Sequence, residues 1–135
     1  MGLPHQSLFT VFEVSEKWGC SQARILDWAI ADELDLVAGF PVVKFDEEQA
    51  SGLMSVAGTD VRPLFRPFGA AAKKVNVEQA KRPGSNEWKR ITSPRGGVRM
   101  EAADIMITAS EIERFESAHG FARPRASGPG VPPRY

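Results

Sequence analysis

Two short amphipathic segments near the N-terminus constrain the fold of this chain more than any other feature. Residues 10–34 read TVFEVSEKWGCSQARILDWAIADEL. Thr10 and Glu13 form a capping-box pattern, and Ser21 is a second candidate N-cap. Between them, Gly19 can adopt the positive φ with which many helices end. The segment therefore predicts two short helices joined by a tight corner.

Each predicted helix carries an apolar face. In the first, Val11, Val14 and Trp18 follow helical spacing. The second presents a stripe of Ile25, Leu26, Ala29 and Ile30. Because Trp18 and Trp28 both belong to these faces, we interpret them as core residues and not as exposed platforms for nucleobases.

The rest of the chain mixes β-prone segments with turns and ends in one more helix. FPVVKF at 40–45 predicts a strand or short hairpin, and VRMEAADIMI at 98–107 predicts the approach to a last buried strand. Thr108 and Glu111 repeat the capping-box pattern at the start of the final helix, and Gly120 stands where that helix should end.

These elements predict an α+β fold. Residues 6–45 form an N-terminal helix-turn-helix unit with a wing. Residues 46–120 form a small β-rich, basic middle plus the C-terminal helix, packed with the first unit into one body. Residues 121–135 are rich in Pro and Gly with little to bury, so we predict a disordered tail.

Composition excludes several classes of protein. No apolar run approaches the roughly 20 residues that span a bilayer, and the start MGLPHQSLF lacks a secretory signal pattern. The single cysteine, Cys20, excludes an intrachain disulfide and a cysteine-based zinc cluster, and we interpret it as a buried, inert thiol. We therefore predict a cytoplasmic protein without catalytic residues, metal or cofactor.

A glycine-rich basic stretch, SPRGGVR, occupies residues 93–99. It could hold a phosphate, but it lacks the lysine-serine ending of a P-loop. A solvated hairpin turn is the interpretation we favour.

Charge is strongly segregated along the chain, although the formal net charge is zero. Residues 1–50 contain three Lys/Arg against nine Asp/Glu, a net of −6. Residues 61–99 contain ten against two, a net of +8, and residues 100–120 contain one against five, a net of −4. The basic middle either packs against the acidic ends or presents a cationic surface to a partner.

Residues 8–36, LFTVFEVSEKWGCSQARILDWAIADELDL, resemble the helix-turn-helix of the excisionase and MerR-like winged-helix superfamily. The positions that carry the likeness are Phe9, Thr10, Val14, Ser15, Trp18, Gly19, Cys20, Ser21, Trp28 and Leu34. The closing DIMITASEIERFE is similar to the end of small bacterial and phage proteins that pair such a unit with a β-rich middle.

The resemblance implies a small DNA-binding protein, a transcriptional regulator or accessory factor, whose second helix enters the major groove. By position, Ser21, Gln22, Ala23 and Arg24 would then reach base edges. Glutamine can read adenine and arginine can read guanine, each through two hydrogen bonds.

The sequence departs from that pattern in charge. Positions that are often basic in DNA-binding relatives hold Ala23, Asp27 and Glu33, and Asp32 replaces the glycine at the wing entry. Residues 10–34 carry five acidic and two basic side chains, so phosphate contacts have to come from the basic middle. The predicted DNA-binding residues are Ser21, Gln22, Arg24, Arg62, Arg66, Lys73, Lys74, Lys89, Arg90, Arg95 and Arg99.

A second function class stays open beside DNA binding. The same acidic helices could form a protein–protein interaction module that docks on a basic protein or mimics DNA. An enzyme is disfavoured, because no nucleophile, general base or cofactor loop emerges. Since no long heptad helix is present, we predict a monomer or a weak dimer.

Overall fold

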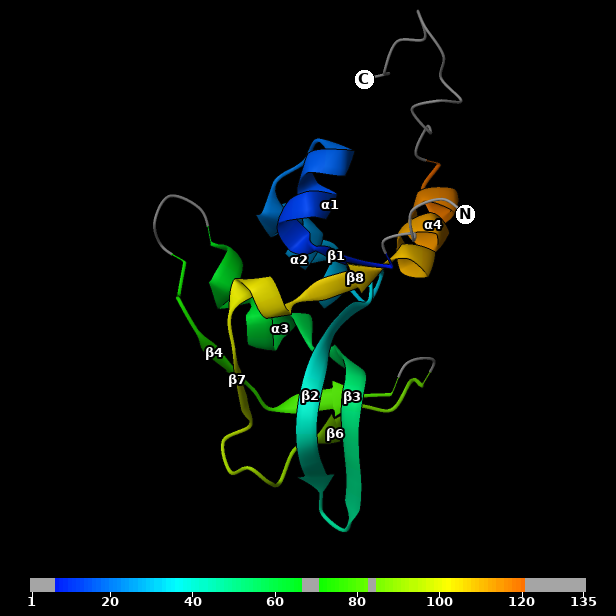
Figure 1. Ribbon diagram of the computed structural model, residues 1–135. Coiled ribbons are helices and arrows are strands. Elements are labelled where there is room, and N and C mark those ends of the chain that lie inside the picture. Colours follow the sequence, from blue (N-terminus) through cyan, green and yellow to red (C-terminus); the bar gives the residue numbers. More distant parts are fainter. Residues whose placement is uncertain (1–6, 67–70, 83–84, 121–135) are drawn as a thin grey trace, which may run out of the picture.

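A six-stranded antiparallel sheet dominates the structure, a computed structural model that describes residues 7–66, 71–82 and 85–120. Its strand order is β1-β8-β2-β3-β5-β6, and β4 and β7 form a separate two-stranded sheet (Figure 1). The large sheet contains β1 Leu8–Thr10, β2 Leu36–Phe45, β3 Glu48–Val56, β5 Gln79–Lys81, β6 Lys89–Arg90 and β8 Met106–Thr108. The small sheet contains β4 Val75–Val77 and β7 Val98–Met100.

The β2–β3 hairpin is the longest strand pair of the large sheet, and in Figure 1 it extends away from α1 and α4. It pairs Leu36 with Val56 at its base and Phe45 with Glu48 at its tip. A register shift near Pro41 interrupts the ladder. Proline has no N–H to donate, so a bulge is where a strand tolerates it.

The sheet curves until the chain after β6 meets β2 again. Lys44 donates its N–H to the Ser93 carbonyl and accepts from the Thr92 N–H, both at 2.8 Å. The hairpin therefore has neighbours along both edges. Buried side chains of this region are Val43, Phe45, Met54, Val56, Ala80 and Ile91.

The helices lie mainly around the base of the hairpin (Figure 1). They are α1 Val11–Trp18, α2 Gln22–Ile30, α3 Gly58–Val61 and α4 Ala109–Ala118, with the 3-10 helices η1 Arg62–Phe65 and η2 Ala102–Asp104. Within the described residues, no helix is long and apolar enough to cross a membrane.

The predicted starts of the first two helices are confirmed. Thr10 accepts the Glu13 N–H through its hydroxyl, and the Glu13 carboxylate accepts the Thr10 N–H in return. Gly19 ends α1 with a φ of 68°. Ser21 then accepts the Arg24 N–H at 3.1 Å and starts α2.

The predicted fold class was wrong. Two helices occupy residues 11–30, but the structure does not show the N-terminal helix-turn-helix unit with a small wing. Instead, β1 pairs with β8 from the other end of the described chain, and β2 lies inside a sheet that draws on most of the sequence. The physical reason is that a two-stranded wing cannot bury its own apolar side chains, so later strands complete the sheet. The predicted tail, 121–135, lies outside the described residues.

An aromatic cluster joins the N-terminal helices to α4. The Phe115 ring stacks on Trp18 at a centroid distance of 4.9 Å and lies 4.8 Å from Trp28. Trp18 and Trp28 meet edge to face at 5.8 Å, and the Trp18 indole N–H donates to Glu116. Both tryptophans pack against the hydrophobic core as predicted, but they are partly buried and not core residues in full.

The SPRGG turn before β7 needs its glycines for two different reasons. Gly96 and Gly97 both have positive φ, 85° and 89°, where a side chain is strained. A Cβ at Gly96 would meet nothing within 4 Å, whereas one at Gly97 would lie 2.1 Å from the Val77 carbonyl oxygen. Close backbone approach between this turn and β4 therefore depends on Gly97.

We expect Gly97→Ala to destabilise the protein more than Gly96→Ala. Gly96→Ala adds only left-handed backbone strain, about 1–2 kcal/mol. Gly97→Ala adds the same strain and also a clash with the Val77 backbone, which cannot move aside. Its loss in unfolding free energy should therefore be at least about twice as large. Urea unfolding followed by tryptophan fluorescence measures both. Equal losses for the two variants would contradict the close approach.

Candidate nucleic-acid interface

The N-terminal end of α2 and helix η1 border two adjoining surface depressions. One, of about 490 Å³, is lined by Ser21, Gln22, Ala23, Phe65, Arg66 and Ala71, among others. The other, of about 350 Å³, is lined by Ala23, Leu26, Arg62, Phe65 and Arg66. Since Ala23, Phe65 and Arg66 belong to both, the two depressions form one continuous surface, which we call the α2–η1 surface.

Local sequence explains why η1 presents arginines here. Pro63 fixes φ at the start of the 3-10 turn, and Leu64 and Phe65 bury their side chains beneath it. Arg62 and Arg66, which flank this buried pair, are left exposed. Arg62 extends to α2, where its guanidinium nitrogen lies 3.4 Å from the Asp27 carboxylate.

The chain that resumes at residue 71 carries further cations close to η1. The Ala72 N–H donates to the Pro63 carbonyl at 2.8 Å, which places Lys73 and Lys74 beside η1. Lys74 Nζ lies 3.9 Å from a Glu101 carboxylate oxygen. In the β4–β7 pair, Arg99 lies opposite Asn76, and its side chain is exposed.

The α2–η1 surface is therefore positively charged. Arg62 and Arg66 line it, no carboxylate is among the described residues that line it, and Asp27, which pairs with Arg62, is the acidic residue in contact with these arginines. Arg24 places its guanidinium carbon 5.3 Å from the centre of the Trp28 ring, which restrains it next to α2.

The remaining predicted cations lie elsewhere. Lys89 binds the Glu48 carboxylate at the tip of the hairpin, and so does Arg82, which was not a predicted contact. The hydrogen bond from Lys89 and then that from Arg82 lower the pKa of Glu48. Arg90 lies 3.0 Å from a Glu78 carboxylate oxygen. Arg95 is exposed in the turn before β7. The structure thus divides the basic middle into two parts, and only one borders α2.

Cys20 lies half-buried at the corner between α1 and α2. Burial raises the pKa of its thiol, although the positive charge of Arg24 acts in the opposite direction. A raised pKa keeps a thiol protonated and poorly nucleophilic. The thiol is thus less buried than predicted, and its lack of reactivity stays a prediction.

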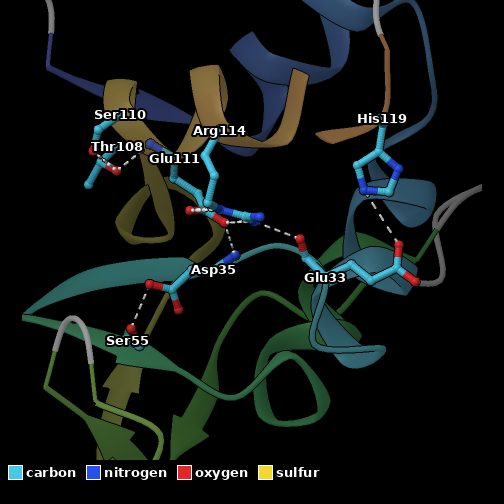
Figure 2. A network of polar contacts seen from close by, with 8 residues as sticks. All are labelled: Glu33, Asp35, Ser55, Thr108, Ser110, Glu111, Arg114 and His119. Atoms are coloured by element: carbon cyan, nitrogen blue, oxygen red, sulfur yellow. Dashed lines mark hydrogen bonds and ion pairs between the residues drawn. The ribbon is translucent and has the colours of Figure 1, made fainter. Parts of the chain in front are cut away.

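A polar network joins α4 to the chain after α2 and to the base of the hairpin (Figure 2). The Glu111 carboxylate accepts the Asp35 N–H at 2.8 Å and two hydrogen bonds from Arg114. A third hydrogen bond from Arg114 reaches the Glu33 carbonyl at 2.8 Å. Thr108 accepts the Glu111 N–H at 3.1 Å as predicted, but no capping box is formed at α4.

Asp35 is the member of this network whose carboxylate is most affected by burial. Its carboxylate accepts a 2.9 Å hydrogen bond from Ser55, whose side chain is fully buried. Burial is the main influence on the pKa of Asp35 and raises it above the ordinary 3.8, while Ser55 and Lys81 act to lower it. Ionised Asp35 therefore costs folding free energy near neutral pH.

Sequence reasoning missed several parts of this arrangement. Nothing local in the sequence indicated that Leu64, Phe65 and Ala71 would line a depression beside α2. The Asp27–Arg62 contact joins residues 35 positions apart, and the Asp35–Glu111 contact joins residues 76 positions apart. Only the Asp35 side chain offered a signal, because a lone carboxylate between Leu34 and Leu36 has to find a polar partner.

Comparison with known protein families, with curated proteins and with solved structures gave no match for this chain.

Asp35→Asn should stabilise the protein at neutral pH. The raised pKa means that the folded state binds this proton more tightly than the unfolded state. Protonated Asp35 therefore contributes fully to folding stability below pH 3.8, and this contribution is lost as the pH rises through the raised pKa. Asparagine cannot ionise and can still accept from Ser55, so the gain in unfolding free energy should be present at pH 7 and vanish below pH 3.8. Urea unfolding at both pH values measures it, and a gain of equal size at both would contradict the assignment.

Proposed function

We propose that this protein binds DNA through the α2–η1 surface. The observation that carries the proposal is the placement of Arg62 and Arg66 beside the N-terminal residues of α2, in one continuous surface with Gln22. Cations supply most of the affinity for phosphates, whereas side chains such as glutamine can read base edges. The surface combines both types of group within reach of one ligand.

The helix itself favours an anion at this end. The N-terminus of α2 carries the positive end of the helix dipole, and Ser21 caps only part of its N–H groups. Acidic side chains that looked prohibitive in the sequence are partly neutralised by other contacts. Asp27 lies against Arg62, and Glu13 is engaged in the cap of α1. The electrostatic obstacle to DNA is thus smaller than the charge count of residues 10–34 suggests.

Arg66→Gln should weaken DNA binding and reduce its salt dependence. Removing one phosphate-binding cation lowers the slope of log K against log salt by about 1. Fluorescence anisotropy with a labelled random-sequence duplex, titrated at several salt concentrations from about 50 mM, measures both quantities. Arg90→Gln is the matched control, because it removes the same charge from β6, where Arg90 pairs with Glu78.

Equal losses of affinity for Arg66→Gln and Arg90→Gln would show that total charge, and not the α2–η1 surface, determines binding. A folded wild-type protein that binds no duplex even at low salt contradicts the proposal outright. The protein-interaction hypothesis would then take its place.

Asp27→Asn should strengthen binding. The change removes a negative charge that repels phosphate, and it releases Arg62 from its ion pair. The side chains of Arg62 and Asp27 are each 55% exposed. One unit charge at about 4 Å in water is worth about 1 kcal/mol, which corresponds to about fivefold in affinity. The same anisotropy assay measures the gain. Glu113→Gln, an equal charge change on the exposed face of α4, should give little or no gain.

A further inference from the structure

The α2–η1 surface combines exposed arginines with apolar side chains. Contacts between arginines and phosphates give affinity without sequence information, and they make no use of an apolar group. The apolar residues of α2 and η1 that line the two depressions, which we call the apolar lining, are Ala23, Leu26, Leu64 and Phe65. This lining therefore points to a second kind of contact at the same surface.

The apolar lining offers only a small area to a ligand. Leu26 is fully buried, and Leu64 and Phe65 keep only 4% and 6% of their surface exposed. Ala23, which is half-buried, lines both depressions together with Phe65. A large apolar side chain of a protein partner would gain little contact on so small an area, whereas a single methyl group needs no more than this.

Gln22 lies directly beside the apolar lining. It is the first residue of α2, it is half-buried, and it lines the larger depression with Ser21. In the major groove, a glutamine amide can form two hydrogen bonds with adenine, through N6 and N7. Thymine, the base paired with adenine, presents its C5 methyl group in the same groove, where alanine and phenylalanine side chains contact it. A·T pairs thus offer one group to Gln22 and another to the apolar lining.

We infer that the α2–η1 surface prefers A·T pairs, because the thymine methyl group packs on the apolar lining against Ala23 and Phe65. The inference rests on the proposed function and deepens it by naming the bases that the surface selects. Arginines supply the part of the affinity that is common to all sequences, and Ala23 acts as a residue that determines specificity.

Replacement of thymine by deoxyuridine tests the inference, because uracil keeps the hydrogen-bonding groups of thymine and lacks only the methyl group. Two labelled duplexes of the same A·T-rich sequence, one with thymine and one with deoxyuridine, are compared by fluorescence anisotropy at about 50 mM salt. Burial of one methyl group corresponds to roughly three- to fourfold in affinity. The thymine duplex should therefore bind at least about threefold more tightly.

Substitutions at Ala23 locate the methyl contact. Ala23→Asn places a polar amide beside Phe65 and should bring the ratio of the two affinities close to one. Ala23→Thr adds a hydroxyl but keeps a methyl group, so it should retain the preference. Ala23 lies in the first turn of α2, where short polar side chains are tolerated, and circular dichroism verifies that both variants fold. Arg66→Gln is the matched control, since it should weaken binding to both duplexes by the same factor.

The outcomes separate this inference from the function on which it rests. Equal affinity of the wild-type protein for both duplexes, with the loss caused by Arg66→Gln still present, overturns the methyl contact and leaves DNA binding in place. A thymine preference that persists in folded Ala23→Asn also overturns it, because the methyl group is then read elsewhere. A wild-type protein that binds neither duplex at low salt removes both the inference and the proposed function.

Discussion

The pairing of β2 with β3 is the interaction on which the rest of the structure depends. Because Leu36 lies opposite Val56, the chain that enters the hairpin from α2 and the chain that leaves it for α3 start side by side. Gly58 lets them approach closely, since a Cβ there would lie 3.0 Å from the Ile30 backbone nitrogen and 3.1 Å from Ala29 Cβ. The register at the base of the hairpin therefore fixes η1 against α2 and, with it, the positions of Arg62 and Arg66.

The two ends of α2 differ in electrostatic character. Arginines gather around the N-terminal end, where the helix dipole already attracts anions. Carboxylates gather around the C-terminal end, where the dipole disfavours them, and Arg114 offsets only part of that charge. One short helix thus separates two surfaces of opposite charge, which a formal net charge of zero conceals.

Local signals in the sequence were sufficient for the helix starts but not for the sheet. Thr10, Glu13 and Ser21 act within four residues of their partners, so their capping roles could be predicted. The strands could not be assigned in the same way. Several are only two or three residues long, and β2 contains a proline that argued against a long strand until the bulge accommodated it. The α2–η1 surface could be predicted only in part for the same reason. Its arginines could be identified in the sequence, but their position beside α2 depends on the register of the hairpin.

Charge counting along the chain overestimates the cationic surface for a related reason. Of the ten cations between residues 61 and 99, Arg82 and Lys89 pair with Glu48, Arg90 with Glu78, Lys74 with Glu101 and Arg62 with Asp27. Those that border α2 come from η1 and the chain after it, whereas α1 contributes the exposed Glu16. A duplex on this surface would therefore meet phosphate-binding groups along one flank of α2 only. Contacts along one flank would involve the phosphates of a single DNA strand, so the affinity should be modest and should fall readily with salt.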